Sequence, residues 1–120
     1  MIPEYICGLT FAPFVPAGVI ATDAAIESLS TMKEQTNANF VIFVPAAYQE
    51  NTTSEEIDYT SPSTMTDDEL CLIIAKAREL GLHVAIKPTV NCRDGSWRAH
   101  IHFFDEDVPC EPKWGNWFKS

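Results

Sequence analysis

Apolar residues gather along this chain in short runs that are separated by longer amphipathic segments. Three of the runs, at residues 6–11, 40–45 and 83–88, consist mostly of β-branched, aromatic and other apolar side chains. Runs of this length and composition predict buried β-strands. The middle run, Phe-Val-Ile-Phe-Val-Pro, has no polar residue. Such a run is typical of a parallel strand that is covered on both faces.

The segment after the first run has the spacing of an amphipathic helix. Ile26, Leu29 and Met32 recur three residues apart with mostly polar residues between them, which predicts an apolar stripe on one side of a helix. Thr22 or Asp23 can serve as the N-cap, because both side chains accept a hydrogen bond from a free backbone amide of the first turn. We expect this helix to end near residue 36.

A second helix is predicted with clearer boundaries. Thr66 and Glu69 form a capping box, in which the Thr66 hydroxyl accepts from the Glu69 amide and the Glu69 carboxylate accepts from the Thr66 amide. Gly81 suits the left-handed residue that follows a helix. The apolar positions between these ends are spaced like one helix face: Leu70, Ile73, Ile74, Ala77 and Leu80.

The elements alternate as strand, helix, strand, helix, strand. A helix-length connection makes two successive strands parallel, because it crosses over the sheet in a right-handed sense, and the predicted fold class is α/β. Three strands with two helices leave both sheet edges open, which α/β domains avoid by adding strands or closing a barrel. We therefore expect residues 1–120 to be the N-terminal part of one larger domain, with an exposed sheet that allows self-association.

Composition and charge narrow the range of partners. The 120 residues are 46% hydrophobic and carry a formal net charge of −9. We expect a folded core, and no affinity for nucleic acid or anionic membranes, whose phosphates repel an acidic protein. The sequence has no apolar run long enough to cross a bilayer and no secretory signal at its start. A cytoplasmic location, with the four cysteines as reduced thiols, is favoured.

Two segments outside these elements have the composition of a binding site. Residues 46–65 form a polar connection that is long for a simple link between elements. Residues 89–120 have no sustained period, yet they hold all three tryptophans and two of the three histidines. Trp114, Trp117 and Phe118 are spaced like one face of a starting helix, so packing is favoured over a carbohydrate platform for them.

A set of short motifs extends over nearly the whole chain and is specific through its order and spacing: Gly8–Phe14, Pro45, Tyr48-Gln49, Thr64, Asp68, Leu72, Gly81–Pro88 and Gly95–Arg98. Together these motifs resemble the N-terminal portion of family 113 glycoside hydrolases, which are (β/α)8 barrels with β-mannanase activity. Barrels of this kind take about 250 residues. The resemblance implies a partial (β/α)8 TIM barrel, with the first three βα units and parallel strands.

The resemblance also implies a retaining mechanism with two catalytic glutamates, one after the fourth strand and one at the seventh. Both lie beyond residue 120, so we expect no catalytic residue, metal or cofactor within the chain, and whether it is an enzyme by itself stays open. The implied partner is a β-linked polysaccharide or oligosaccharide. The chain departs from the family at Thr89 and Asn91, where a His and an Asp often follow the Lys-Pro pair, and at Ala99-His100, which replaces Gly-Glu.

Six residues after the second and third strands are candidates for substrate binding: Tyr48, Gln49, Lys87, Asn91, Trp97 and Arg98. Barrel active sites are built from loops at the carboxyl ends of the strands, so we expect Tyr48, Lys87 and Trp97 to converge at one end of the sheet. Trp97 can stack on a pyranose ring while Arg98 donates to hydroxyl groups. Three alternatives stay open: Tyr48 anchors its loop, Trp97 packs its loop down, and Lys87 at the end of a buried strand pairs with a carboxylate.

Other interpretations are weaker. Four loop carboxylates can supply an acid/base pair, although acidic loops in an acidic chain are usually solvated: Glu50, Asp58, Asp94 and Glu106. Four residues offer zinc-ligand types without the paired spacing of compact zinc motifs: Cys92, His100, His102 and Cys110. The main alternative function is a noncatalytic α/β module that binds a carbohydrate or a partner through its aromatic loop.

Overall fold

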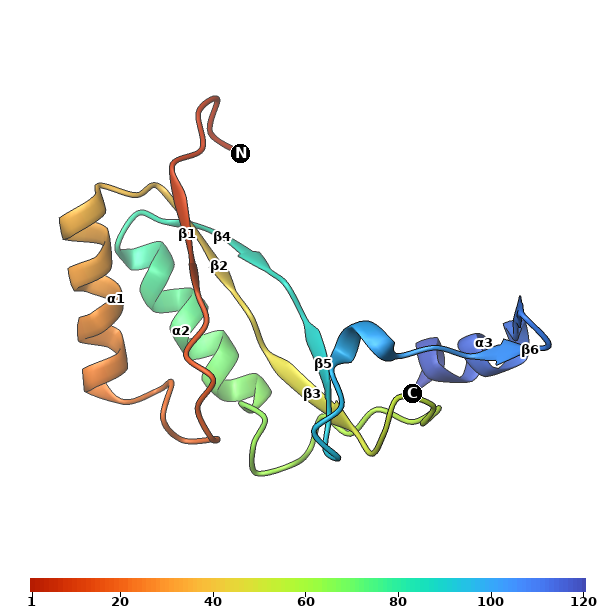
Figure 1. Cartoon of the computed structure of the whole chain (residues 1–120). Helices are drawn as coiled ribbons and strands as arrows, with labels where there is room; N and C mark the ends of the chain where they lie inside the picture. The colour runs from red at the N-terminus through yellow and green to blue at the C-terminus, as the bar shows by residue number, and fades with distance from the viewer. The chain divides into compact units, whose positions relative to one another are not determined.

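The computed structural model describes all 120 residues, and the chain folds into two compact units. Unit 1 consists of residues Met1–Pro45 and Pro62–Pro88, and unit 2 of residues Ala46–Ser61 and Thr89–Ser120. Figure 1 traces the chain through both units. Each of the two segments of unit 2 begins within a few residues of the carboxyl end of a strand of unit 1.

Unit 1 contains a parallel sheet of three strands, β1 (Gly8–Phe11), β2 (Phe40–Phe43) and β4 (His83–Ile86), in the order β1-β2-β4. Each strand lies inside one of the predicted apolar runs and is four residues long. The predicted α/β class and the parallel direction of the three strands are confirmed. β2 is the central strand, because it pairs with β1 on one side and β4 on the other.

The two predicted helices are α1 (Asp23–Thr36) and α2 (Asp67–Glu79). Thr22 is the N-cap of α1, and its hydroxyl accepts from the Ala25 amide at 3.3 Å. After α1, Asn37 has a left-handed backbone with φ of 52°. Asparagine is among the few residues that take this conformation readily. The sequence thus placed both ends of α1 within a residue.

The predicted capping box of α2 is present, and its glutamate makes a further long-range bond. The Thr66 amide donates to Glu69 Oε2 at 2.8 Å, and the Gly18 amide, from the loop before α1, donates to Glu69 Oε1. These hydrogen bonds, first of all the one from the Thr66 amide, lower the pKa of the buried Glu69 carboxyl. The charged carboxylate therefore ties the loop before α1 to the start of α2.

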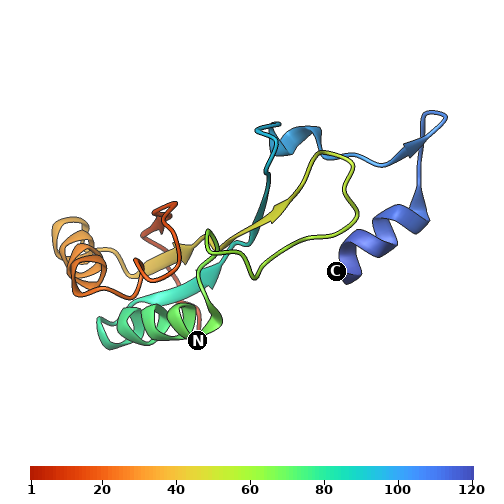
Figure 2. The same ribbon diagram turned by 90° about the horizontal axis from the view of Figure 1, so that it is seen from below.

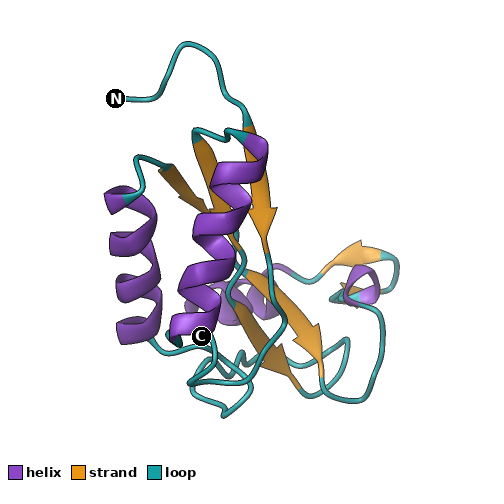
Figure 3. Ribbon diagram, turned by 90° about the vertical axis from the view of Figure 1, so that its left-hand side faces the viewer, coloured by secondary structure: helices purple, strands orange, loops and turns teal.

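The core of unit 1 lies between the sheet and both helices. Val41 and Phe43 of β2 are at most 1% exposed, and they pack with Leu29 of α1 and Ile73 of α2. Figure 3 shows α1 and α2 on the same side of the three strands, as expected for successive right-handed crossovers. On the other face of β2, Ile42 is only half-buried. The expectation that β2 is covered on both faces is therefore wrong for unit 1, where helices cover one face alone.

Unit 2 has regular structure where the sequence predicted irregular connections. β3 (Ala46–Gln49) and β5 (Thr89–Cys92) form a second parallel pair. A 3-10 turn (Arg98–His100) and a hairpin of β6 (Phe104–Asp105) and β7 (Val108–Pro109) follow. The chain ends in α3 (Glu111–Lys119), drawn in dark blue in Figure 2. No helix in the structure is both long and apolar enough to cross a membrane.

The Glu69 bonds predict how the stability of unit 1 depends on pH. Because the pKa of Glu69 is lowered on folding, its contribution is complete above the ordinary value of 4.5 and is lost as the pH falls through the lowered pKa. At neutral pH we expect Glu69→Gln to reduce the free energy of unfolding by about 1 kcal/mol. Once the pH is below the lowered pKa of Glu69, the difference from the wild type should disappear.

Urea titrations monitored by circular dichroism at several pH values measure this effect. Asp68→Asn is the matched control, since Asp68 lies beside Glu69 in the same helical turn and is exposed. The control should lose much less stability at neutral pH. A constant difference between wild type and Glu69→Gln from neutral to acid pH would contradict the charged-carboxylate explanation.

The open sheet of unit 1 predicts self-association. Leu9 on the edge strand β1 is 42% exposed, and Ile86 on the edge strand β4 is 44% exposed. We expect the 120-residue chain to associate with rising concentration, and Leu9→Lys to weaken association because a charged edge opposes strand pairing. Leu72→Lys is the control, since Leu72 is 39% exposed on the helix α2. Size-exclusion chromatography measures association, and a wild type that stays strictly monomeric would refute this prediction.

Candidate functional site

Five of the six candidate residues lie in unit 2, and Lys87 lies in unit 1. The strand pair β3·β5 places two of them directly opposite each other, because Tyr48 pairs with Asn91. Side chains alternate between the two faces of a strand, so Tyr48 and Asn91 share one face. Both are half-buried, and the Asn91 side chain makes no hydrogen bond in the structure.

The next residue of β3, Gln49, points to the opposite face and is 1% exposed. Its amide donates to the Asn51 carbonyl and accepts from Trp117 Nε1 at 2.8 Å. Both ends of the amide are therefore engaged inside unit 2. Gln49 links the end of β3 to α3, a contact between positions 68 residues apart in the sequence.

The aromatic residues of α3 pack mainly against one another. The Trp114 ring meets the Phe103 ring edge-on, with centroids 4.7 Å apart, and Phe103 is 2% exposed. Trp117 lies 5.8 Å from Trp114 and is half-buried. These contacts agree with the packing interpretation for Trp114 and Trp117. Phe118 contacts both tryptophans but is 76% exposed.

Beside Tyr48 lies Arg93, a residue that none of the sequence motifs indicated. The guanidinium carbon of Arg93 lies 5.5 Å from the centroid of the Tyr48 ring. Arg93 Nε is 3.1 Å from Glu50 Oε1, and its Nη2 donates to Asp58 Oδ2. The signal in the sequence is the alternation of polar residues at 89, 91 and 93, which is visible only if this segment is read as a strand.

Asp58 belongs to a short structured return toward β3. Its backbone forms an antiparallel bridge with Tyr48, with N–O distances of 2.9 and 2.7 Å. Its Oδ1 accepts from the amide and the hydroxyl of Thr60, each at 2.8 Å. These two bonds, with a smaller effect of the Arg93 charge, lower the pKa of Asp58. The carboxyl is thus held in its charged form.

Trp97 and Arg98 follow a tight turn after β5. Asp94 accepts from the Ser96 amide at 2.8 Å and from the Ser96 hydroxyl at 2.9 Å, while Gly95 takes a φ of 82° that a side chain would disfavour. Trp97 is 67% exposed and meets only the edge of the His100 ring, at 5.6 Å. Arg98 is exposed and has no ion pair. The Trp97 ring is therefore open to a ligand.

The environment of the Lys87 side chain differs from the predicted one. Its backbone amide donates to the Phe43 carbonyl at 2.8 Å, which extends the pairing of β2 and β4 by one bond. Its side chain is exposed and makes no ion pair. The argument that Lys87 needs a partner because of burial is therefore wrong, since solvent already hydrates the ammonium group. The convergence of Lys87 with Tyr48 and Trp97 stays a prediction.

The possible zinc ligands do not form a cluster. No three His, Cys, Asp or Glu side chains come together in a way that can hold a metal ion. Cys92 is buried, and burial followed by the nearby Asp94 charge raises the pKa of its thiol. His102 Nδ1 instead lies 2.7 Å from the His100 carbonyl oxygen. All four cysteines are free.

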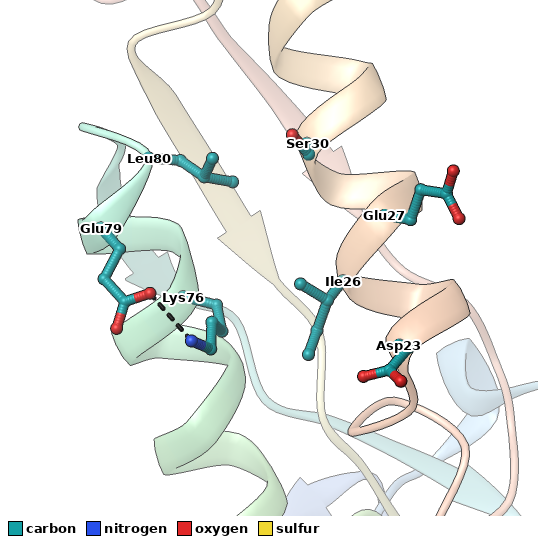
Figure 4. A pocket seen from close by; sticks show the side chains of 7 residues that line it. All are labelled: Asp23, Ile26, Glu27, Ser30, Lys76, Glu79 and Leu80. Atoms are coloured by element: carbon teal, nitrogen blue, oxygen red, sulfur yellow. Dashed lines mark hydrogen bonds and ion pairs between the residues drawn. The ribbon is translucent and has the colours of Figure 1, made fainter.

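Unit 1 has an open groove of about 730 Å³ between α1 and α2. Figure 4 shows that the Lys76–Glu79 ion pair forms part of one wall, while Asp23 and Glu27 come from the other helix. None of the six candidate residues lines it. The groove is lined by Asp23, Ile26, Glu27, Ser30, Lys76, Glu79 and Leu80.

Comparison with known proteins gives a consistent family assignment. The model of Glycoside Hydrolase Family 113 matches residues 9–120. A solved structure of a GH113 β-1,4-mannanase is similar to 98% of the chain, with 47% identity and a TM-score of 0.87. A complex structure of a GH113 β-1,4-mannanase has 45% identity over 98% of the chain, with the same TM-score.

A third similar structure is the GH113 β-mannanase AaManA from Alicyclobacillus acidocaldarius in complex with ManMIm. It has 38% identity over 97% of the chain and a TM-score of 0.82. The chain spans 38% of the length of each of the first two structures and 37% of the third. A search of curated proteins gave no match.

Proposed function

We propose that this chain, which belongs to glycoside hydrolase family 113, forms the substrate-binding N-terminal part of a hydrolase acting on β-mannan or a related β-linked polysaccharide. Its parallel βα units are part of a (β/α)8 barrel. The observation that carries this proposal is the 47% identity to a GH113 β-1,4-mannanase over 98% of the chain. Residues 1–120 are then one part of a single barrel domain.

The substrate-binding role rests on side chains that have no hydrogen bond or ion pair within the chain. Trp97 offers an exposed ring on which the C–H face of a pyranose can stack. The Arg98 guanidinium has no ion pair, and the Asn91 amide has no hydrogen bond. Tyr48 presents its ring on the same strand face as Asn91. These four residues can donate to or accept from sugar hydroxyl groups.

Gln49 and Lys87 complete the proposed set in different ways. Gln49 is buried between Asn51 and Trp117, so its contribution is to hold the end of β3 in place. Lys87 carries an exposed, unpaired ammonium group directly after β4, and such a group can donate to hydroxyl oxygens of a sugar.

We assign no acid/base or nucleophile role to the carboxylates of unit 2. A retaining glycosidase needs two carboxyl groups about 5 to 5.5 Å apart, one of which keeps its proton until it protonates the leaving oxygen. Glu50 and Asp58 both pair with Arg93, and the pKa of Asp58 is lowered. Asp94 accepts two bonds from Ser96. Asp58, whose carboxyl is held charged, is a poor general acid, and the Glu50 and Asp94 carboxylates are engaged by Arg93 and Ser96. We therefore place the catalytic glutamates in another part of the barrel.

The proposed stacking role of Trp97 predicts different effects for two tryptophans. Trp97→Ala should weaken the binding of a β-1,4-mannan oligosaccharide by about 1 to 2 kcal/mol, roughly five- to thirtyfold in Kd. Trp117→Ala should instead reduce the free energy of unfolding by about 2 kcal/mol, since it removes the partner of Gln49. Isothermal titration calorimetry and thermal unfolding measure the two effects.

Phe118→Ala is the matched control for Trp97, because Phe118 is also a highly exposed aromatic residue of unit 2. It should leave sugar affinity unchanged. Equal affinity of Trp97→Ala and wild type would remove Trp97 from the binding site.

If the catalytic carboxylates lie in another part of the barrel, the 120-residue chain should bind β-mannan without cleaving it. Reducing-sugar assays should detect no product above the uncatalysed background, because the proposal places both catalytic carboxyl groups outside residues 1–120. Product formation that is abolished by Glu50→Gln or Asp94→Asn would place the acid/base pair within the chain and refute the proposal.

A further inference from the structure

Arg93 makes more side-chain contacts than the other basic residues of unit 2, yet none of the roles above includes it. It reaches Glu50, Asp58 and the face of the Tyr48 ring at the same time. We infer that Arg93 is a positioning residue, which holds the Tyr48 ring in the orientation that contacts the sugar. This inference rests on the proposed role of Tyr48 in substrate binding.

The guanidinium is itself fixed from two directions. Glu50 directly follows β3, whereas Asp58 lies on the segment that returns along β3. A planar guanidinium that binds two carboxylates through different nitrogens has little rotational freedom. The Arg93 amide also donates to the Gln49 carbonyl at 2.8 Å, which anchors the backbone of Arg93 beside β3. Two side-chain ion pairs and one backbone hydrogen bond thus hold Arg93 at this end of the strand pair.

The Tyr48 ring needs such a support. Its backbone is held by the bridge to Asp58 and by pairing with Asn91, but rotation about the side-chain bonds is not limited by these contacts. The Tyr48 hydroxyl makes no hydrogen bond in the structure. A cation within 6 Å of the ring centroid attracts the π-face. Arg93 is therefore the group that restricts the ring while the hydroxyl stays available to a ligand.

The same contacts argue against Arg93 as a direct sugar ligand. Its Nε and Nη2 groups face Glu50 and Asp58, and a sugar hydroxyl would have to displace a charged acceptor. Arg98 has no such partner. Two arginines of the same loop segment thus have different roles, and the difference follows from the two carboxylates that only Arg93 meets.

The first test needs no sugar. In the full chain with ¹³C-labelled tyrosine rings, Arg93→Met should shift the Tyr48 ring resonances, while those of the exposed Tyr5 in unit 1 stay in place. Arg78→Met is the matched control, because Arg78 is exposed on α2 in unit 1 and has no ion pair. Unchanged Tyr48 resonances in Arg93→Met would overturn the inference, whatever the chain binds.

The second test is a double-mutant cycle in the affinity for a β-1,4-mannan oligosaccharide. Arg93→Met should weaken binding about fivefold in the wild-type background. In the Tyr48→Ala background it should have no further effect, because the ring it positions is absent. Arg93→Lys keeps a cation and should restore part of the affinity. Near-UV circular dichroism of the tryptophans reports whether each variant keeps the fold of unit 2.

The outcomes separate the inference from the proposed function. A loss of affinity that is equal in both backgrounds would show that Arg93 acts on the fold or on the sugar directly, and would overturn the inference while Tyr48 keeps its role. An unchanged affinity in Tyr48→Ala would refute the proposed role of Tyr48, and the inference with it, even if the ring resonances shift. Loss of binding in Tyr48→Ala with a coupled Arg93 effect supports both.

Discussion

Val41 and Phe43, on one face of β2, lie beneath α1 and α2, and the rest of the chain is organised around this contact. Both helices must cross the same face of the sheet to bury these side chains, which makes β1, β2 and β4 parallel. Phe43 and Ile86 are paired, so β2 and β4 end side by side. Both segments of unit 2 continue from these two strand ends.

Unit 2 depends on polar contacts to a greater extent than unit 1. Its few buried apolar side chains, such as Phe103 and Cys92, are supplemented by long-range hydrogen bonds. Gln49 accepts from the Trp117 indole, and Asn116 donates to Glu55 at 2.7 Å. A buried polar group such as the Gln49 amide stabilises one arrangement only when it finds its partner. This explains why loops with a candidate binding role still have a defined structure.

Residues of the same type have different roles in these loops because their partners differ. Trp117 is half-buried and hydrogen-bonded to Gln49, whereas Trp97 is 67% exposed. Arg93 meets two carboxylates, whereas Arg98 meets none. In this member of glycoside hydrolase family 113, the structure therefore separates side chains that support the loops from side chains that have no hydrogen bond or ion pair. The acidic groups that pair with Arg93 belong to this support.

The sequence by itself determined the two helices and the three strands of unit 1, because caps, apolar periods and strand-forming runs are local signals. Thr22 and the Thr66–Glu69 box each act within one helical turn. Only the tertiary structure revealed β3 and β5, which are four residues long and partly polar, and which are stabilised by pairing with each other. The burial of Gln49 and the position of Arg93 over Tyr48 were decided in the same way. Gln49 bonds to Trp117, 68 residues away in the sequence, and Arg93 pairs with Asp58, 35 residues away. No local sequence pattern records a contact across such a distance.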